Sequence, residues 1–94
     1  MEILYLAWDD ENEEKLAKHG VPAERADEVG QGPYRILRNK RHRRGQVKMV
    51  GPDFGGSFWT IVLERTSQYG VWRPVTGWRS TEGELTLYHG KGRK

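Results

Sequence analysis

Apolar and charged positions follow a simple order along the first third of the chain. Residues 3–7 form a short apolar run that predicts a strand, and the acidic residues that follow stand where a helix N-terminus favours negative charge. The pattern predicts a first helix over about residues 10–19, ended by Gly20. A second helix is expected to begin at Pro22, because small apolar residues recur at three-residue spacing over residues 23–29.

The pattern changes from helical to strand-like at Tyr34. Four stretches carry it, separated by turn residues: 34–39, 46–51, 58–65 and 71–78. The stretch 58–65 is apolar on both of its alternating faces, which predicts the most deeply buried strand. Pro74 has no N–H to donate to a β-ladder, so it predicts either an edge position or a bulge in the last strand.

The C-terminal part of the chain predicts one more helix. Thr81 is followed three residues later by Glu84, the capping-box pattern, so a short helix is expected over about residues 82–89, with a frayed basic tail over residues 90–94. The sequence has no internal repeat and no linker, so residues 1–94 are interpreted as a single domain. The order of elements predicts an α+β fold with an antiparallel β-sheet of four to five strands, two N-terminal helices and one short C-terminal helix.

Composition narrows the class of protein. The chain has 94 residues, of which 35% are hydrophobic, and that share supplies the core of one small domain. It contains no cysteine, which excludes disulfide bonds and thiolate metal sites and suits a reducing cytosol. No apolar run is long enough to span a bilayer, and the first residues lack the basic region of a signal peptide. We therefore expect a soluble, cytoplasmic protein without a membrane contact.

The net charge of +3 conceals a strong asymmetry along the chain. Residues 1–28 carry nine acidic and three basic residues, residues 29–52 carry seven basic residues and no acidic one, and residues 53–94 carry six basic and four acidic residues. Clustered like charge costs folding energy through self-repulsion, so a basic block inside a structured chain indicates a polyanion or an acidic partner protein. A solvated loop is the alternative interpretation.

The basic residues of the central block fall on two predicted strands and on the hairpin that joins them. They are Arg35, Arg38, Lys40, Arg41, Arg43, Arg44 and Lys48. Arginine makes planar, bidentate contacts with phosphate oxygens, which explains its excess over lysine at a phosphate-binding surface. We expect these residues, together with Arg79 after the last strand, to bind RNA phosphates. Phosphate contacts position a nucleic acid without reading its sequence, and aromatic side chains add stacking platforms for unpaired bases.

The spacing of acidic residues and histidines argues against a metal site. His19, His42 and His89 lie far apart in the sequence, and no His, Asp or Glu pair within a predicted element has metal-ligand spacing. We therefore expect neither a metal nor another cofactor. Metal-free cleavage is open to RNA, because its 2′-hydroxyl attacks the adjacent phosphate once a base takes the proton and cations stabilise the developing negative charge. DNA lacks this nucleophile.

Four residues are candidates for that chemistry. His19 or His42 would transfer the proton, Arg73 would stabilise the phosphate, and Glu64 would act as a base or orient another group. Three of them also have a structural interpretation. His19 lies where a helix C-terminus favours positive charge, His42 lies on a solvated basic loop, and Glu64 can form a salt bridge with a neighbouring arginine.

Two stretches of the sequence resemble a known family. WDDENEEKLAKHGVPAERADEV, residues 8–29, and VWRPVTGWRSTEGELTLY, residues 71–88, are similar to the opening and closing motifs of the BrnT family of type II toxin–antitoxin ribonucleases. The residues on pattern positions are Trp8, Asp10, Lys18, His19, Gly20, Arg73, Thr81, Glu84 and Tyr88. Two positions depart from the pattern, because Pro74 replaces an apolar β-branched residue and Trp78 stands where the family usually has arginine.

The resemblance implies a RelE-like fold and a metal-independent endoribonuclease toxin that cleaves mRNA. It also implies a cognate antitoxin that neutralises the toxin, commonly a small DNA-binding protein that represses the operon. The alternative interpretation is a basic RNA- or protein-binding module of the same fold without catalytic activity.

Overall fold

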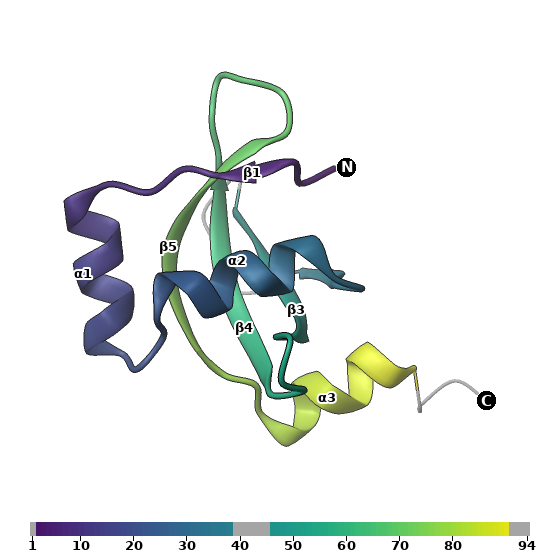
Figure 1. Ribbon diagram of the computed structural model, residues 1–94. Helices are drawn as coiled ribbons and strands as arrows, with labels where there is room; N and C mark the ends of the chain where they lie inside the picture. Colours follow the sequence, from purple (N-terminus) through teal and green to yellow (C-terminus); the bar gives the residue numbers. More distant parts are fainter. Residues whose placement is uncertain (1, 39–45, 91–94) are drawn as a thin grey trace.

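The computed structural model describes residues 2–38 and 46–90 of the chain, and Figure 1 shows how the elements follow one another. In chain order they are β1 (Tyr5–Leu6), α1 (Asp10–Lys18), α2 (Ala23–Gln31), β2 (Arg35–Arg38), β3 (Gln46–Pro52), β4 (Phe58–Arg65), β5 (Val71–Arg79) and α3 (Glu82–His89). The elements expected from the sequence are present, with ends that differ by a residue or two. Across the described residues, none of the helices is long and apolar enough to cross a membrane.

The described strands form one sheet in the order β1-β5-β4-β3-β2. β2 to β5 form an antiparallel meander, as the sequence pattern predicts. β1 pairs with β5 in parallel, so the expected antiparallel sheet is mixed at this one edge. The parallel pairing follows from the chain path, because two helices and three strands separate β1 from β5 and no hairpin joins them.

A capping box fixes the N-terminus of α1. Asp9 Oδ1 accepts the N–H of Asn12 at 2.9 Å, and Asn12 Oδ1 accepts the N–H of Asp9 at 2.8 Å. The buried Asn12 side chain also donates to the carbonyl oxygens of Ala7 and Pro74, at 2.9 and 3.2 Å, and so joins the start of α1 to β5. At the other end Gly20 adopts φ 84°, a left-handed conformation that favours glycine, as expected for a helix terminator.

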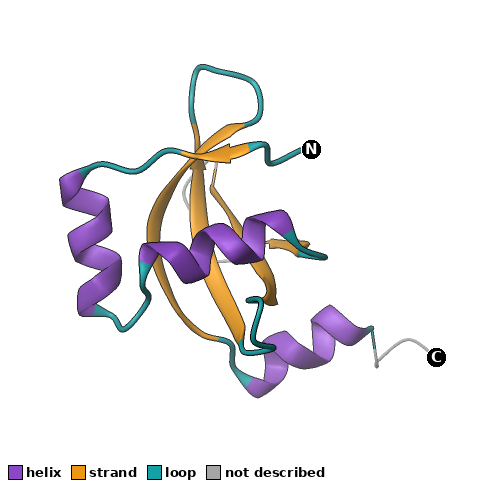
Figure 2. Cartoon of the chain, viewed as in Figure 1, coloured by secondary structure: helices purple, strands orange, loops and turns teal. Residues whose placement is uncertain are grey.

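α1 and α2 lie against one face of the sheet, which we call the covered face. Figure 2 shows α2 crossing β3 and β4, with α1 beside β5. The apolar cluster between helices and strands consists of Ile3, Leu16, Val21, Ala26, Val29, Met49, Trp59, Ile61, Leu63 and Trp72, all buried. β4 has buried residues on both of its faces, which confirms that it is the most deeply buried strand.

The bulge expected at Pro74 is present. Val62 pairs with Thr76 and Leu63 with Pro74, so Val75 is left over in the register between β4 and β5. β1 pairs only with the first residues of β5, so Pro74 also lies on a part of β5 that has one strand neighbour among the described residues. Pro74 therefore lies both beside a bulge and on an edge segment of the sheet, the two settings that tolerate its missing N–H.

Gly77 marks a tight contact between β5 and β4. A Cβ atom at this position would lie 2.9 Å from the carbonyl oxygen of Thr60 and 3.0 Å from Cδ1 of Ile61. β5 therefore has no room for a side chain where it passes the centre of β4, and glycine allows the two strands to approach.

Candidate nucleic-acid interface

The face of the sheet opposite the covered face carries polar, charged and aromatic side chains beside a few aliphatic ones, and we call it the open face. Successive residues of a strand point to opposite faces, so the neighbours of the core residues Met49 and Ile61 belong to it. The register places its residues in three rows across β2 to β5: Arg35, Val50, Thr60 and Trp78; Leu37, Lys48, Val62 and Thr76; and Gln46, Glu64 and Arg73. α3 lies at one end of the sheet and the β4–β5 turn at the other (Figure 1).

α3 projects one buried carboxylate onto the open face. Glu84 is 7% exposed and accepts hydrogen bonds from groups on three strands and from the N-cap residue of its own helix. The donors are Thr60 Oγ1 at 2.8 Å, Thr81 N at 2.9 Å, Trp78 Nε1 at 3.1 and 3.2 Å and Lys48 Nζ at 3.2 Å. The Thr81 contact is the capping box expected from the sequence, which the structure confirms. Glu84 thus closes the helix N-terminus and joins α3 to the sheet.

The surroundings of Glu84 hold it in its charged form. Burial by itself raises the pKa of a carboxyl group, because water no longer solvates the charge. The hydrogen bonds from Thr81, Thr60, Trp78 and Lys48 together outweigh this desolvation, so the pKa of Glu84 lies below its ordinary value. The open face therefore carries a fixed negative charge, and the Lys48 ammonium supplies the positive charge that faces it.

An aromatic cluster lies one helical turn further along α3. The rings of Phe58, Tyr88 and His89 meet edge to face, with centroids 5.1 to 5.6 Å apart. The guanidinium carbon of Arg35 lies 5.8 Å from the centre of the Tyr88 ring, a cation–π distance. The Tyr88 hydroxyl also donates a hydrogen bond to the carbonyl oxygen of Pro33. These contacts join α3 to β2 and its preceding turn, while Arg35 stays exposed.

Arg73 and Glu64 lie at the other end of the open face, beside α1. They border a hollow of about 200 Å³ whose other walls are Glu11, Asn12, Lys15, Pro74 and Val75. Arg73 donates a hydrogen bond to Asp9 and lies 3.8 Å from Glu11. The bond to Asp9 raises the pKa of Arg73, and the same bond, with a smaller contribution from the Asn12 N–H, lowers the pKa of Asp9. Arg73 therefore ties the start of α1 to β5 in addition to facing the hollow.

The structure places the site residues predicted from the sequence in three groups. The first shares the open face and consists of Arg35, Lys48, Glu64 and Arg73. The second lies outside the described residues and consists of Lys40, Arg41, His42, Arg43, Arg44 and the side chain of Arg38. The third consists of His19, the exposed C-cap residue of α1, and Arg79, whose guanidinium carbon lies on the covered face 5.1 Å from the centre of the Trp59 ring.

Two residues of the open face are not among the site residues predicted from the sequence. The sequence identifies Glu84 as a helix cap and Trp78 as a departure from the family pattern, but it does not bring the two together. The spacing of Thr81 and Glu84 is the one local signal, and it accounts for the cap alone. Within residues 2–38 and 46–90, no group of three His, Asp or Glu side chains is close enough to hold a metal ion.

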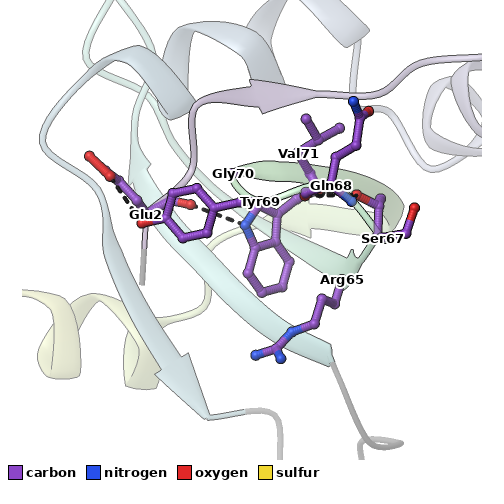
Figure 3. A pocket seen from close by; sticks show the side chains of 9 residues that line it. Glu2, Arg65, Ser67, Gln68, Tyr69, Gly70 and Val71 are labelled. Atoms are coloured by element: carbon purple, nitrogen blue, oxygen red, sulfur yellow. Dashed lines mark hydrogen bonds between the residues drawn. The ribbon is translucent and has the colours of Figure 1, made fainter.

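A second hollow, at the β4–β5 turn, contains no described residue that the sequence predicts for catalysis or phosphate binding. It has a volume of about 340 Å³ and is formed by Glu2 and residues 65–72 (Figure 3). The Tyr69 hydroxyl donates to the Glu2 carboxylate and the Trp72 indole N–H to the Glu2 carbonyl oxygen, both at 3.2 Å. The negative charge of Glu2 raises the pKa of Tyr69. These contacts fasten the N-terminal segment to the turn.

These features define an α+β protein in which two helices cover one face of a mixed sheet and the other face carries charged and aromatic side chains. No protein-family model and no curated protein sequence matches the chain. Its structure is similar to a crystal structure of the ribonuclease toxin BrnT from Brucella abortus, with a TM-score of 0.59 and 13% sequence identity, covering 87% of this chain and 99% of that chain. The chain therefore has the BrnT fold, and the resemblance indicated by its motifs is confirmed at the level of the fold.

Proposed function

We propose that this chain is a ribonuclease toxin that cleaves mRNA without a metal ion. The observation that carries the proposal is the open face, where Arg35 and Lys48 accompany aromatic side chains. The fold that carries this face is shared with a ribonuclease toxin. Cations beside aromatic rings suit single-stranded RNA, because the cations contact phosphates and the rings stack on unpaired bases. The chain between β2 and β3 contains four more basic residues, which adds to the expected positive charge.

The proposed reaction uses the 2′-hydroxyl of the RNA as the nucleophile. A base removes the proton of this hydroxyl, its oxygen attacks the adjacent phosphorus, and the bond to the 5′-oxygen of the next nucleotide breaks as that oxygen receives a proton. The products are a 2′,3′-cyclic phosphate and a 5′-hydroxyl end. Glu64 pairs with Arg73 in the sheet register and is a candidate base, while Arg73 would stabilise the extra negative charge on the phosphate. His19 and His42 are the other candidates for moving a proton.

We also propose a cognate antitoxin as the protein partner, because a ribonuclease toxin must be blocked in the cell that makes it. In pairs of this kind the antitoxin is commonly a small DNA-binding protein. The test is a short open reading frame beside or overlapping the gene for this chain. Its product is expected to bind the purified chain and to restore growth on co-expression, and a product that does neither would contradict the pairing.

Incubation of the purified chain with single-stranded RNA in the presence of a chelator tests the proposed chemistry. We expect fragments with 2′,3′-cyclic phosphate ends, and a loss of about 10²-fold or more in rate for Glu64→Gln. His19→Gln and His42→Gln identify which histidine, if either, moves a proton. Arg65→Gln is the matched control, because this cation lies over Trp72 near the β4–β5 turn. RNA that stays intact at every protein concentration would contradict the proposal, and cleavage that requires Mg²⁺ would contradict the metal-free chemistry.

A binding module without catalytic activity is the second candidate, and one observation favours it. Two cations of the open face are paired with carboxylates of the same chain, Lys48 with Glu84 and Arg73 with Asp9. Expression without a partner separates the two functions, because a toxin arrests growth and a docking module does not. A salt series identifies the ligand of such a module. Binding to a polyanion weakens steeply between low and physiological salt, whereas a hydrophobic protein interface barely responds.

A further inference from the structure

Trp78 is the tryptophan that the open face presents. All four tryptophans are among the described residues. Trp59 and Trp72 are 8% and 5% exposed and belong to the apolar core, while Trp8 packs against that core and donates its indole N–H to Asp27. Trp78 is half-buried and lies in the row of the open face that crosses β4 at Thr60, toward α3. Of the four, it is the one placed to meet a ligand on this face.

Glu84 fixes both Trp78 and a neighbouring cation. Its two carboxylate oxygens share the Trp78 Nε1–H, at 3.1 Å from Oε1 and 3.2 Å from Oε2, and Oε2 also accepts a hydrogen bond from Lys48 Nζ at 3.2 Å. Its Oε1 atom accepts hydrogen bonds from Thr60 Oγ1 and the Thr81 N–H, at 2.8 and 2.9 Å. The sheet and the helix terminus therefore anchor the carboxylate, and the carboxylate in turn binds both the indole N–H and the ammonium group.

We propose that Lys48 and Trp78 form a subsite for one nucleotide of single-stranded RNA. The indole ring of Trp78 stacks on an unpaired base, the ammonium group of Lys48 contacts the adjoining phosphate, and Glu84 is the positioning residue for both. This subsite rests on the proposed function, because it takes RNA as the ligand of the open face.

The chemistry of the pair matches this ligand. The indole N–H, the one polar group of the Trp78 side chain, is turned to Glu84, so the accessible remainder of the ring is an apolar stacking surface. A ring without a free donor tolerates any base, because every base has a π-face. The cation beside the ring attracts the phosphate, which positions the strand without reading its sequence.

Trp78 also changes what this position can recognise. The family that the motifs resemble usually has arginine here, and an arginine would add a second cation opposite Glu84. Trp78 keeps an N–H donor for Glu84 and replaces the charge with a ring. The subsite is therefore expected to bind a chain with bases more tightly than an abasic one. Trp78→Arg is expected to lose this preference and to make binding depend more strongly on salt.

Equilibrium binding in the presence of a chelator tests the subsite, with a short labelled single-stranded RNA and an abasic sugar–phosphate chain of the same length as probes. We expect Trp78→Leu to weaken RNA binding by about 5- to 150-fold while binding of the abasic chain changes little. Trp78→Phe retains a ring and is expected to keep most of the affinity for RNA. Lys48→Met is expected to weaken the binding of both probes. It should also reduce the slope of the logarithm of the binding constant against the logarithm of the salt concentration by about one counterion.

Two further variants complete the experiment. Phe54→Leu is the matched control, because Phe54 is 70% exposed but its N–H is bonded to Glu28 of α2, away from the subsite. It is expected to bind both probes as the wild-type protein does. Glu84→Gln tests positioning, because it leaves the ring and the cation in the chain and removes the charged acceptor. The preference for RNA over the abasic chain is expected to fall, and an unchanged preference would reject the positioning role.

The possible results separate the subsite from the proposed function. A folded Trp78→Leu variant that binds RNA as tightly as the wild-type protein overturns the subsite and leaves the ribonuclease proposal standing. A wild-type protein that binds neither probe at low salt overturns both. Base-dependent binding without any cleavage supports the subsite and counts against the catalytic proposal alone. Circular dichroism of each variant establishes that it is folded, and Trp78→Phe gives the ring a second test if Trp78→Leu does not fold.

Discussion

The two faces of the sheet use the same strands for different purposes. On the covered face, β3 and β4 present Met49, Ile61 and Leu63, all buried beneath α1 and α2. On the open face the alternate positions include Lys48 and Thr60, which bond to α3 through Glu84. The comparison teaches that a strand period of two lets one stretch of sequence specify a core and a binding surface at the same time.

Burial by itself does not distinguish the two faces. Thr60 on the open face is as inaccessible as its neighbour Ile61, since both are 0% exposed. Thr60 can be buried because its hydroxyl forms hydrogen bonds with Glu84 and Ser80, at 2.8 and 2.9 Å. Throughout the described residues no buried side-chain polar atom lacks a partner. The covered face should therefore respond to lost volume and the open face to lost hydrogen bonds.

Leu63→Ala is expected to have the largest effect on stability. It removes a fully buried side chain from the covered face and leaves a cavity, which costs about 4 kcal/mol. Glu64→Ala, one residue further along β4, changes an exposed side chain of the open face and should alter the free energy of unfolding little. Urea unfolding of both variants measures the difference. Similar losses for the two neighbours would show that the faces do not differ as described.

Glu84→Ala is expected to cost nearly as much, about 3 kcal/mol, although the residue is polar. The substitution removes the capping box of α3 and leaves Lys48, Thr60 and Trp78 without their shared acceptor. Urea unfolding again provides the measurement, and Glu84→Gln, which retains one acceptor oxygen, is the matched control with a smaller loss. A change as small as that for Glu64→Ala would mean that the hydrogen bonds to Glu84 do not stabilise the open face.

The contribution of Glu84 should depend on pH with a defined sign. Because the native pKa of Glu84 is lowered, the carboxylate stabilises the fold fully above its unfolded pKa of about 4.3 and loses this effect as the pH falls through the native pKa. The difference in unfolding free energy between wild type and Glu84→Gln should therefore be constant from neutral pH to about pH 5 and shrink below it. A difference that grows in acid would contradict the lowered pKa.

Gly77→Ala is expected to cost about 2 kcal/mol, because its Cβ atom would clash with the Thr60 carbonyl oxygen and crowd the Ile61 side chain. This substitution tests whether the two faces of the sheet are coupled. The clash pushes β5 away from β4 and so displaces Trp78, the next residue, on the open face. We expect a lower Tm together with weaker binding of single-stranded RNA. A lower Tm with unchanged RNA binding would show that the faces are independent at this point.

Asp9→Asn is expected to have the smallest effect. Asparagine is a good N-cap residue, so α1 should remain capped, while Arg73 loses a charged partner. The pKa of Asp9 is lowered chiefly by the bond from Arg73, so its contribution to stability is present above its ordinary value and lost as the pH falls through the native pKa. Thermal unfolding at neutral and acidic pH should show a small loss that is confined to neutral pH. A loss of equal size in acid would contradict the pairing.

Most of the fold can be predicted from local sequence patterns. The cap formed by Thr81 and Glu84, the terminator Gly20 and the strand over residues 58–65 each depend on residues that are close in the chain, and the structure confirms them. Pro74 illustrates the limit of this reasoning. An edge position and a bulge both accommodate its missing N–H, so the sequence leaves the choice open, and the structure combines the two.

The arrangement of the open face could not be predicted in the same way. Glu84 bonds to Lys48, 36 residues earlier in the chain, so its second role depends on how α3 packs on the sheet. Basic residues also look alike in a sequence, whereas the register decides the face to which each one belongs. Lys48 and Arg73 belong to the open face and Arg79 to the covered face, a distinction that requires the bulge in β5 to be known.

The parallel pairing of β1 sets the moment at which a newly made chain can complete its sheet. Tyr5 and Leu6 leave the ribosome before their partners Val71 and Trp72, which follow on the order of several seconds later, at about 5–20 residues per second. Contacts of such long sequence separation form slowly, because a large loop must close first. Until β1 docks, Val71 and Trp72 at the start of β5 lack a strand neighbour on this side, so aggregation during synthesis should begin there.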